Sequence, residues 1–284
     1  CCSGPADQRD HDRGSTDVHA TYGDTAGDWG YLLETVQRSA KGFKEIDRSG
    51  RDTGFDIEDY VGKLRWQGER QSVTAKLQYS EETSNSSYLG LTDADFSQDP
   101  NRRYGLSSID QMNNTHSGIS LTHQFEWSDT VSSSTTLYRN DFKRNWFKLS
   151  GGGNIIDAAN GGDANAQGIL DGTVDASGLD YKNNARDYLS QGVQVNFDVD
   201  MGSHQFDFGA RAHEDEMDRF QPVDVYDQVN GSLVFQNTVA PTGSNNRFET
   251  GEALSFWALD TWQATDKLSV NLALRYVDVQ TSRT

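Results

Sequence analysis

Six residues of this chain have side chains suited to holding a negatively charged ligand. They are Arg102, Arg103, Tyr104, Arg139, Lys143 and Arg211. A guanidinium group pairs with a carboxylate through two parallel hydrogen bonds, and an ammonium group binds anions as a point charge. Basic residues are scarce here, 25 against 43 acidic ones, so their clusters carry information and an anionic ligand would seek them. The favoured interpretation is nevertheless that they pair with the plentiful Asp and Glu side chains of neighbouring strands.

Catalytic and metal chemistry is not indicated by the remaining side chains. The six histidines have no metal-ligand spacing on a helix, and no nucleophile, base and acid can be grouped from their positions. An acidic group at 214–218 could take a divalent cation, but a solvated loop mouth is the favoured interpretation. The glycine-rich stretch that begins at Gly151 lacks the Lys-Ser/Thr ending of a phosphate-binding loop. We therefore predict no enzyme, no catalytic residue, no metal site and no intrinsic cofactor.

Composition limits the class of protein. The net charge of -18 over 284 residues makes nucleic acid an improbable partner, because its backbone is an anion. The longest apolar run is four residues, 256–259, whereas a membrane helix needs roughly 20. An aromatic content of 11% argues against disorder. The only cysteines are Cys1 and Cys2, which excludes a disulfide framework elsewhere and leaves their own role open.

Alternation of apolar and polar residues with a period of two is the main structural pattern. It is clear in 71–80, 119–127, 193–199 and 205–213, and again in 268–276. Successive side chains of a strand point to opposite faces, so each segment is predicted to be a strand with one apolar face. We expect the apolar set to point outward from a curved sheet: Val73, Leu77, Val195, Phe197, Phe206, Phe208, Leu272 and Leu274. The set expected on the concave side is Ser72, Lys76, Gln194, Asn196, Asp207, Arg211, Asn271 and Arg275.

The strand at 137–147 carries two of the candidate ligand residues. Tyr138, Phe142 and Trp146 share one phase, and Arg139 and Lys143 share the other. If the aromatic phase faces outward, as the apolar phase does elsewhere, then Arg139 and Lys143 lie on the lumen wall. Aromatic residues gather at both borders of a membrane-spanning barrel, so the aromatic phase is predicted to contribute to such girdles.

Short and long connections alternate along the chain. Long polar segments at 42–54, 83–115, 148–186 and 217–252 alternate with turns of a few residues. Compact soluble domains rarely contain several loops of this length. Outer-membrane barrels combine short periplasmic turns, long external loops and strands of about ten residues. We therefore predict an all-β fold: an antiparallel transmembrane β-barrel sheet of about ten strands over residues 17–284, preceded by a polar segment at 1–16.

Several stretches resemble the TonB-dependent outer-membrane receptors, particularly the branch that takes up ferric citrate and siderophores. Residues 22–33, YGDTAGDWGYLL, resemble their first barrel hairpin, and residues 88–104, YLGLTDADFSQDPNRRY, resemble their second external loop. Residues 138–149, YRNDFKRNWFKL, resemble the strand that leads to their third loop, and 258–262, ALDTW, are a weaker match. The resemblance covers roughly residues 17–280.

The resemblance implies a 22-stranded barrel closed by a plug domain, outer-membrane lipid around it, and a TonB energy-transducing complex as a partner through the plug. Transport of a ferric chelate across the outer membrane of a Gram-negative bacterium would be its activity, with the iron carried as part of the ligand. We find no plug ahead of residue 17, so the resemblance implies that the chain is an internal fragment, a partial barrel with about ten of the 22 strands. A passive porin-like channel is the alternative. An outer-membrane barrel enzyme and a soluble carbohydrate-binding or lyase β-protein are less favoured.

Overall fold

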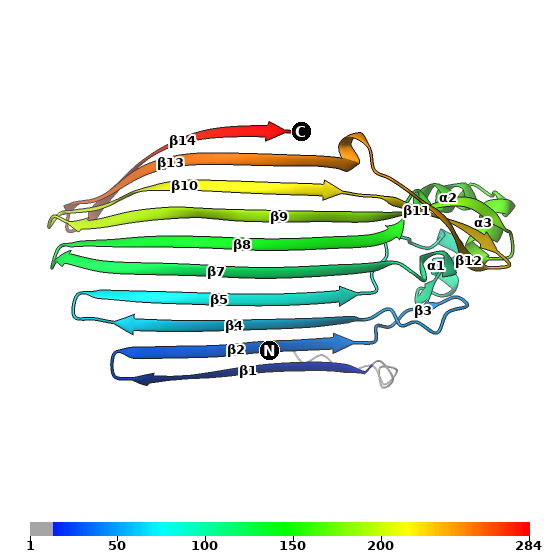
Figure 1. The fold of residues 1–284 in the computed structure, drawn as a ribbon, viewed down its shortest axis with the longest axis horizontal. Coiled ribbons are helices and arrows are strands. Elements are labelled where there is room, and N and C mark those ends of the chain that lie inside the picture. Colours follow the sequence, from blue (N-terminus) through cyan, green and yellow to red (C-terminus); the bar gives the residue numbers. More distant parts are fainter. Residues whose placement is uncertain (1–13) are drawn as a thin grey trace.

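The computed structural model describes residues 14–284, and ten long strands dominate it (Figure 1). Each is antiparallel to its neighbours in one sheet. The strands are β1 (Ser15–Ala26), β2 (Trp29–Ala40), β4 (Phe55–Gln67), β5 (Gln71–Ser84), β7 (Gln111–Ser128), β8 (Val131–Leu149), β9 (Ala176–Asp200), β10 (His204–Phe220), β13 (Asn246–Thr265) and β14 (Leu268–Arg283). The partial antiparallel barrel predicted from the sequence is thus confirmed, as is its strand count. Cys1, Cys2 and most of the polar segment predicted at 1–16 lie outside the described residues.

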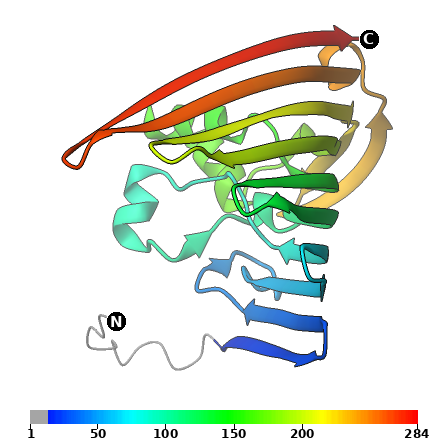
Figure 2. The same ribbon diagram turned by 90° about the vertical axis from the view of Figure 1, so that its left-hand side faces the viewer.

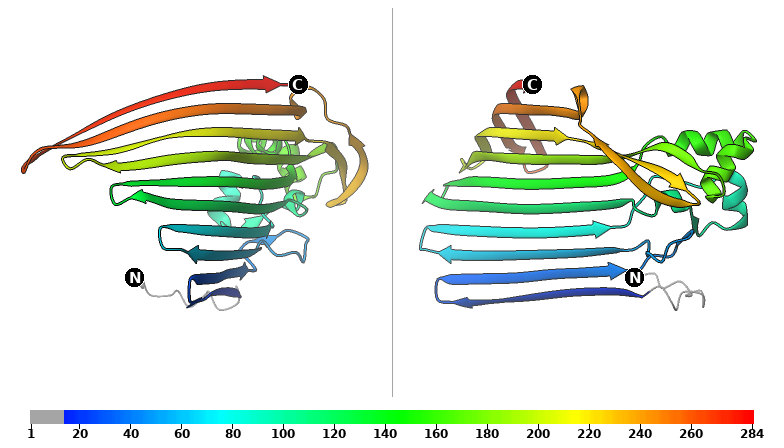
Figure 3. Two further views of the ribbon diagram at one scale, coloured as in Figure 1. Left: turned by 60° about the vertical axis from the view of Figure 1, so that its left-hand side comes forward. Right: turned by 45° about the vertical axis from the view of Figure 1, so that its right-hand side comes forward.

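Two- and three-residue turns join the strands at one end of the sheet, and long loops join them at the other. Gly27 in the first turn has φ of 58°, a left-handed conformation that a two-residue hairpin turn requires and that glycine adopts without strain. Neighbouring hairpins end at staggered heights, as Figure 3 shows. Such a stagger is the shear that a tilted-strand barrel needs.

The sheet curves about an axis parallel to its strands, and its two faces differ as predicted (Figure 2). Leu77 and Leu274 are 59% and 80% exposed on the convex face, where the rings of Phe197 and Phe208 also stack at 5.4 Å. Ser72 is buried on the concave face. The residues predicted to point outward and inward therefore lie on the expected faces. The two sets stay separate across the sheet because residues paired on neighbouring strands point to the same face.

Aromatic residues border an apolar band on the convex face. On β4, Trp66 lies near the short turn, and Tyr60 lies six residues closer to the long loop. At about 3.3 Å per residue, these two rings are about 20 Å apart along the strand. Tyr60 and its neighbour Tyr79 donate their hydroxyls to Glu58 and Glu81, at 3.0 and 2.8 Å. The tyrosine row therefore marks the border between the apolar band and a polar rim.

The long loops contain regular structure of their own. They form β3 (Glu45–Ile46), α1 (Asp93–Gln98), β6 (Arg102–Arg103), α2 (Gly152–Asn160), α3 (Ala164–Asp171), β11 (Val223–Val229) and β12 (Ser232–Val239), with single 3₁₀ turns at Gly105–Ser107 and Gly243–Asn245. Their buried residues make one cluster: Tyr104, Leu106, Leu149, Leu170, Leu179 and Tyr181. The hydrophobic core of the described chain is thus at the loop end, because the sheet itself buries little.

Two edges of the sheet have no further strand among the described residues. β1 pairs only with β2, and β14 pairs only with β13, so the two strands lie at opposite margins (Figure 1). None of the helices in the described part is long and apolar enough to cross a membrane.

Candidate functional site

Arg102 is the centre of an ion-pair cluster between three long loops. Its guanidinium nitrogens lie 2.9 Å from Asp47, 3.1 Å from Asp95 and 2.7 Å from Asp171. Burial alone would raise the pKa of Asp95, but hydrogen bonds from Tyr104, Gln167 and Thr92 and the charge of Arg102 together hold that pKa below its usual range. Arg102 therefore joins loop 41–54, loop 85–110 and α3.

Arg103 and Tyr104 are buried beside it, at 6% and 1% exposure. Arg103 donates from Nε to the Ser107 hydroxyl at 2.8 Å and from another nitrogen to the Asn85 carbonyl. The Tyr104 hydroxyl accepts from the Thr92 amide at 3.1 Å and donates to Asp95 at 2.5 Å. Both side chains are thus used to hold loop 85–110 in shape.

Arg48, which was not singled out from the sequence, provides a second connection between the loops. It donates to the Asp171 carbonyl at 2.5 Å and to the Gly231 carbonyl at 3.3 Å. A Cβ atom built at Gly172, or at Gly231, would collide with its side chain. The first, third and fourth long loops therefore meet around Arg48, and with Arg102 they make the four loops one packed unit.

Arg139 and Lys143 lie on the convex face, so the lumen placement predicted for them is wrong. Arg139 pairs with Asp141 at 2.9 Å, and Lys143 pairs with Asp187 at 3.2 Å, both in exposed positions. The aromatic phase of β8, with Tyr138, points inward instead. The reason is that β8 leaves the apolar band after Leu137, and above the band the convex face is also wet.

Arg211 lies on the concave face, as predicted, within a polar network on the lumen wall. Its Nε donates to the Tyr138 hydroxyl at 2.8 Å, and its Nη2 lies 2.9 Å from His213 Nδ1. His213 lies 2.5 Å from the same hydroxyl and 2.8 Å from Asp215. The acidic group at 214–218 lies within β10 rather than in a loop, so its side chains divide between the two faces.

Four further arginines on the concave face were not singled out from the sequence. Arg144, Arg186, Arg219 and Arg247 are register partners on β8, β9, β10 and β13. They form a row across four adjacent strands, close to the loop end. Each is unremarkable along the chain, and only the register of the sheet aligns them.

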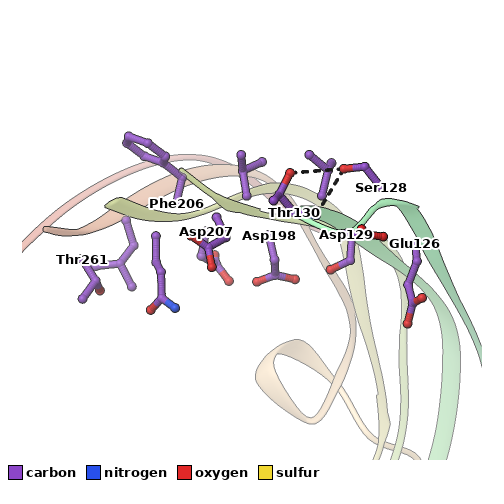
Figure 4. Close-up of a pocket in the computed structure, with 14 residues that line it drawn as sticks. Glu126, Ser128, Asp129, Thr130, Asp198, Phe206, Asp207 and Thr261 are labelled. Carbon is purple, nitrogen blue, oxygen red and sulfur yellow. Dashed lines mark hydrogen bonds between the residues drawn. The ribbon is translucent and has the colours of Figure 1, made fainter. Parts of the chain in front are cut away.

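Acidic side chains gather on the concave face near the short turns of β7, β9 and β10. Glu126, Asp198 and Asp207 point to the inner side of the arch near the short turns, whereas Phe206 points away from it (Figure 4). Trp257 donates to Asp207 at 3.0 Å. Among residues 14–284 no group of three or more His, Cys, Asp and Glu side chains is arranged to hold a metal ion. Between β7 and β10 the concave face is therefore acidic near the short turns, whereas the row of arginines lies toward the loop end.

These features define part of a β-barrel whose packed external loops lie above a polar lumen wall. No family model matches the chain, and no curated protein matches it in sequence. Solved structures do share its fold. The ferric citrate transporter FecA, in its unliganded form, aligns with 97% of this chain and 36% of its own, with a TM-score of 0.67 and 14% identity.

Two other solved structures give the same picture. The siderophore receptor PiuA from Acinetobacter baumannii aligns with 95% of this chain and 42% of its own, at a TM-score of 0.63 and 11% identity. The pyoverdine outer membrane receptor FpvA from Pseudomonas aeruginosa PAO1 aligns with 95% of this chain and 40% of its own, at a TM-score of 0.62 and 11% identity. The chain spans about two fifths of the length of these structures, and the likeness is one of fold.

Proposed function

We propose that the protein containing this chain is an outer-membrane receptor that transports a ferric chelate, with iron entering as part of the ligand. The observation that carries the proposal is the combination of a receptor-type barrel wall with four long loops packed as one unit above a polar concave face. The solved structures that share this fold are described as a ferric citrate transporter and as siderophore or pyoverdine receptors.

Membrane location is supported by the convex face. An apolar band about 20 Å high, bounded by Trp66 and Tyr60 on β4, approaches the roughly 25 Å that lipid-facing bands of outer-membrane barrels span. Charged pairs such as Arg139–Asp141 begin directly above it on β8. The outer membrane of a Gram-negative bacterium is the location that this pattern supports.

The structure supports ligand contact differently for the different residues proposed from the sequence. Arg211 faces the concave side, where a chelate would pass. Arg102, Arg103 and Tyr104 would act through the loops that they hold together, because their polar groups are already occupied. Arg139 and Lys143 face the convex side, which gives them no route to a ligand in the lumen.

Coupling to a TonB complex is proposed through a plug that would belong to the rest of the protein. The test is iron uptake by cells that express the full-length receptor under iron limitation. Radioactive iron supplied as ferric citrate and as several siderophores should enter only when both the receptor and the energy-transducing complex are present. Passive conductance of small solutes by the purified full-length protein in a lipid bilayer, without chelate uptake, would instead support the porin alternative.

A further inference from the structure

Four positive charges stand side by side on the concave wall. Arg144 is the register partner of Arg186, Arg186 of Arg219, and Arg219 of Arg247. Neighbouring strands are about 4.8 Å apart, so these side chains share one face at close spacing. Like charges placed directly opposite each other destabilise a sheet. The row therefore carries an energetic cost that the described chain does not remove.

The Nε groups of this row lack hydrogen-bond partners among the described residues, although Nη1 of Arg219 donates to the Ser244 carbonyl at 3.3 Å and Nη1 of Arg186 donates to the Tyr188 hydroxyl at 3.3 Å. The Nε atoms of Arg144, Arg186, Arg219 and Arg247 are all buried without a hydrogen bond in the described part. Within residues 14–284, no ion pair connects Arg144, Arg186 or Arg219 to a carboxylate. Arg247 alone has one, with Glu249 at 3.0 Å, in a geometry that makes no hydrogen bond. A buried donor without an acceptor costs free energy, which an incoming acceptor would recover.

Acidic partners are not scarce elsewhere in the chain. Arg102 contacts three aspartates and Arg139 contacts one, in a protein with 43 acidic residues. Arg144, Arg186 and Arg219 thus stay without an ion pair to the described residues, although a single Asp or Glu on a neighbouring strand could have supplied one. Two lysines extend the positive region toward the loops, because Lys148 and Lys182 are register partners on β8 and β9.

An aromatic surface lies on the turn side of the row. The rings of Phe142 and Tyr188 stack at 6.0 Å, and Arg186 donates to the Tyr188 hydroxyl at 3.3 Å. Phe142 and Tyr188 share the concave phase with Arg144 and Arg186, two residues away on the same strands. A ligand at the row would therefore have charged donors beside it and ring faces directly below.

We propose that Arg144, Arg186, Arg219 and Arg247 form a binding site for a multivalent oxyanion, a ligand with several carboxylate or phosphate groups. This inference rests on the proposed function and assigns the class of ligand that the lumen wall holds. Guanidinium forks match either oxyanion bidentately. A row of four favours ligands with two or more anionic groups, since one group can satisfy only one or two neighbouring arginines. The site recognises the anionic groups of the ligand and does not require iron.

The experiment uses the purified full-length receptor in detergent and calorimetric titration with iron-free probes. Citrate represents carboxylates, inorganic triphosphate represents phosphates, and acetate is the monovalent control at matched ionic strength. The test variant is Arg186→Gln with Arg219→Gln. The matched control is Arg65→Gln with Arg275→Gln, which removes two charges that lie on the same concave face but outside the row.

We expect at least one multivalent probe to bind the wild type and the control variant, and acetate to bind neither measurably. The row variant should bind the same probe roughly a hundredfold more weakly, because each lost charge-assisted contact accounts for about tenfold. Binding of citrate but not of triphosphate would identify a carboxylate ligand, and binding of triphosphate but not of citrate would identify a phosphate ligand. The proposal is overturned if neither probe binds the wild type, or if both double variants lose affinity equally.

Thermal unfolding gives a second readout that does not depend on transport. Without anion, the row variant should unfold at a higher temperature than the wild type, because two unpaired charges are gone. Adding the anion should raise the unfolding temperature of the wild type and leave that of the row variant unchanged. A row variant that is less stable without anion would contradict the unpaired-charge argument. Because the probes contain no iron, the two proposals are tested separately. The anion-binding site could be refuted while ferric-chelate uptake is observed, and uptake could be absent while the site binds anions.

Discussion

Arg102 and Asp171 are 69 residues apart in the sequence, yet Nη2 of Arg102 donates to Oδ1 of Asp171 at 2.7 Å. This contact joins the second long loop to the helix α3 of the third, and the same guanidinium also holds Asp47 of the first. Three external loops are therefore coupled through one side chain, so a ligand that moves one of them must act on all three.

Replacing Arg102 by methionine should loosen the external loops without unfolding the sheet. Asp47, Asp95 and Asp171 would be left as neighbouring partly buried carboxylates without their cation. Breaking such a pair costs a few kcal/mol, here about 2 because the cluster is partly solvated. Limited proteolysis of the full-length protein should cut within 85–110 much faster. Arg139→Met, which removes an exposed pair, should leave the rate unchanged, and equal rates for both variants would refute the role of Arg102.

Gly172→Ala should disturb the same loop unit by a different route. Gly172 has φ of 70°, and a Cβ atom there would collide with the Arg48 guanidinium. We expect a loss of about 1–3 kcal/mol from strain and displacement of Arg48. Gly153→Ala is the control, because Gly153 lies in α2 with nothing within 4 Å of its Cβ position. Hydrogen exchange at 164–175 should accelerate only in the first variant; protection equal to the wild type would show that Arg48 moves at no cost.

The stability of the loop unit should fall as the pH rises through about 6. Burial raises the pKa of Asp110 to about 6, although hydrogen bonds from Ser87 and the Leu149 amide and the charge of Arg103 oppose the rise. A folded-state pKa above the unfolded value contributes stability below the unfolded pKa, and this contribution is lost as pH rises through the folded pKa. The difference between pH 3.5 and pH 7.5 should be about 3 kcal/mol at most.

Asp110→Asn should remove this pH dependence, because the amide does not titrate and can still accept from the Leu149 amide, which Asp110 Oδ1 contacts at 3.1 Å. The measurement is hydrogen exchange of the Leu149 amide in the full-length protein between pH 4 and pH 7.5, corrected for intrinsic rates. Asp93→Asn, in an exposed position of α1, should keep the wild-type profile. A profile that is flat in the wild type would exclude Asp110 as the titrating group.

Period-two alternation predicted most of the sheet because lipid-facing and lumen-facing residues differ strongly within the apolar band. It gave the wrong face for Arg139 and Lys143 because this difference between the two faces does not extend above the band. Alternation shows which residues share a face, but which face is the lumen was taken from apolarity, and that criterion loses meaning above the band. The row at Arg144, Arg186, Arg219 and Arg247 depends on strand register, which no local pattern in one strand contains.

The helices of loop 148–186 were missed although their boundaries carry local signs. Asp163 accepts from the amides of Asn165 and Ala166 as the N-cap of α3, and Gly172 ends that helix in a left-handed conformation. Both are common helix-boundary residues. Between them the helix is only eight residues long and is stabilised by burying Leu170 in the loop cluster, a tertiary contact that composition does not reveal.

Adjacent residues Leu77 and Gln78 on β5 should face different solvents. Leu77 is 59% exposed on the convex face, whereas Gln78 donates to Asn140 at 3.3 Å on the concave face. Single cysteines at these positions of the full-length protein, labelled with an environment-sensitive fluorophore in lipid vesicles, form a matched pair. The label at 77 should be quenched by brominated lipid and shielded from iodide, and the label at 78 should show the reverse, because one residue along a strand reverses the face. Iodide quenching of both labels to the same degree would exclude a lipid-facing convex surface, and with it the membrane location on which the proposed transport depends.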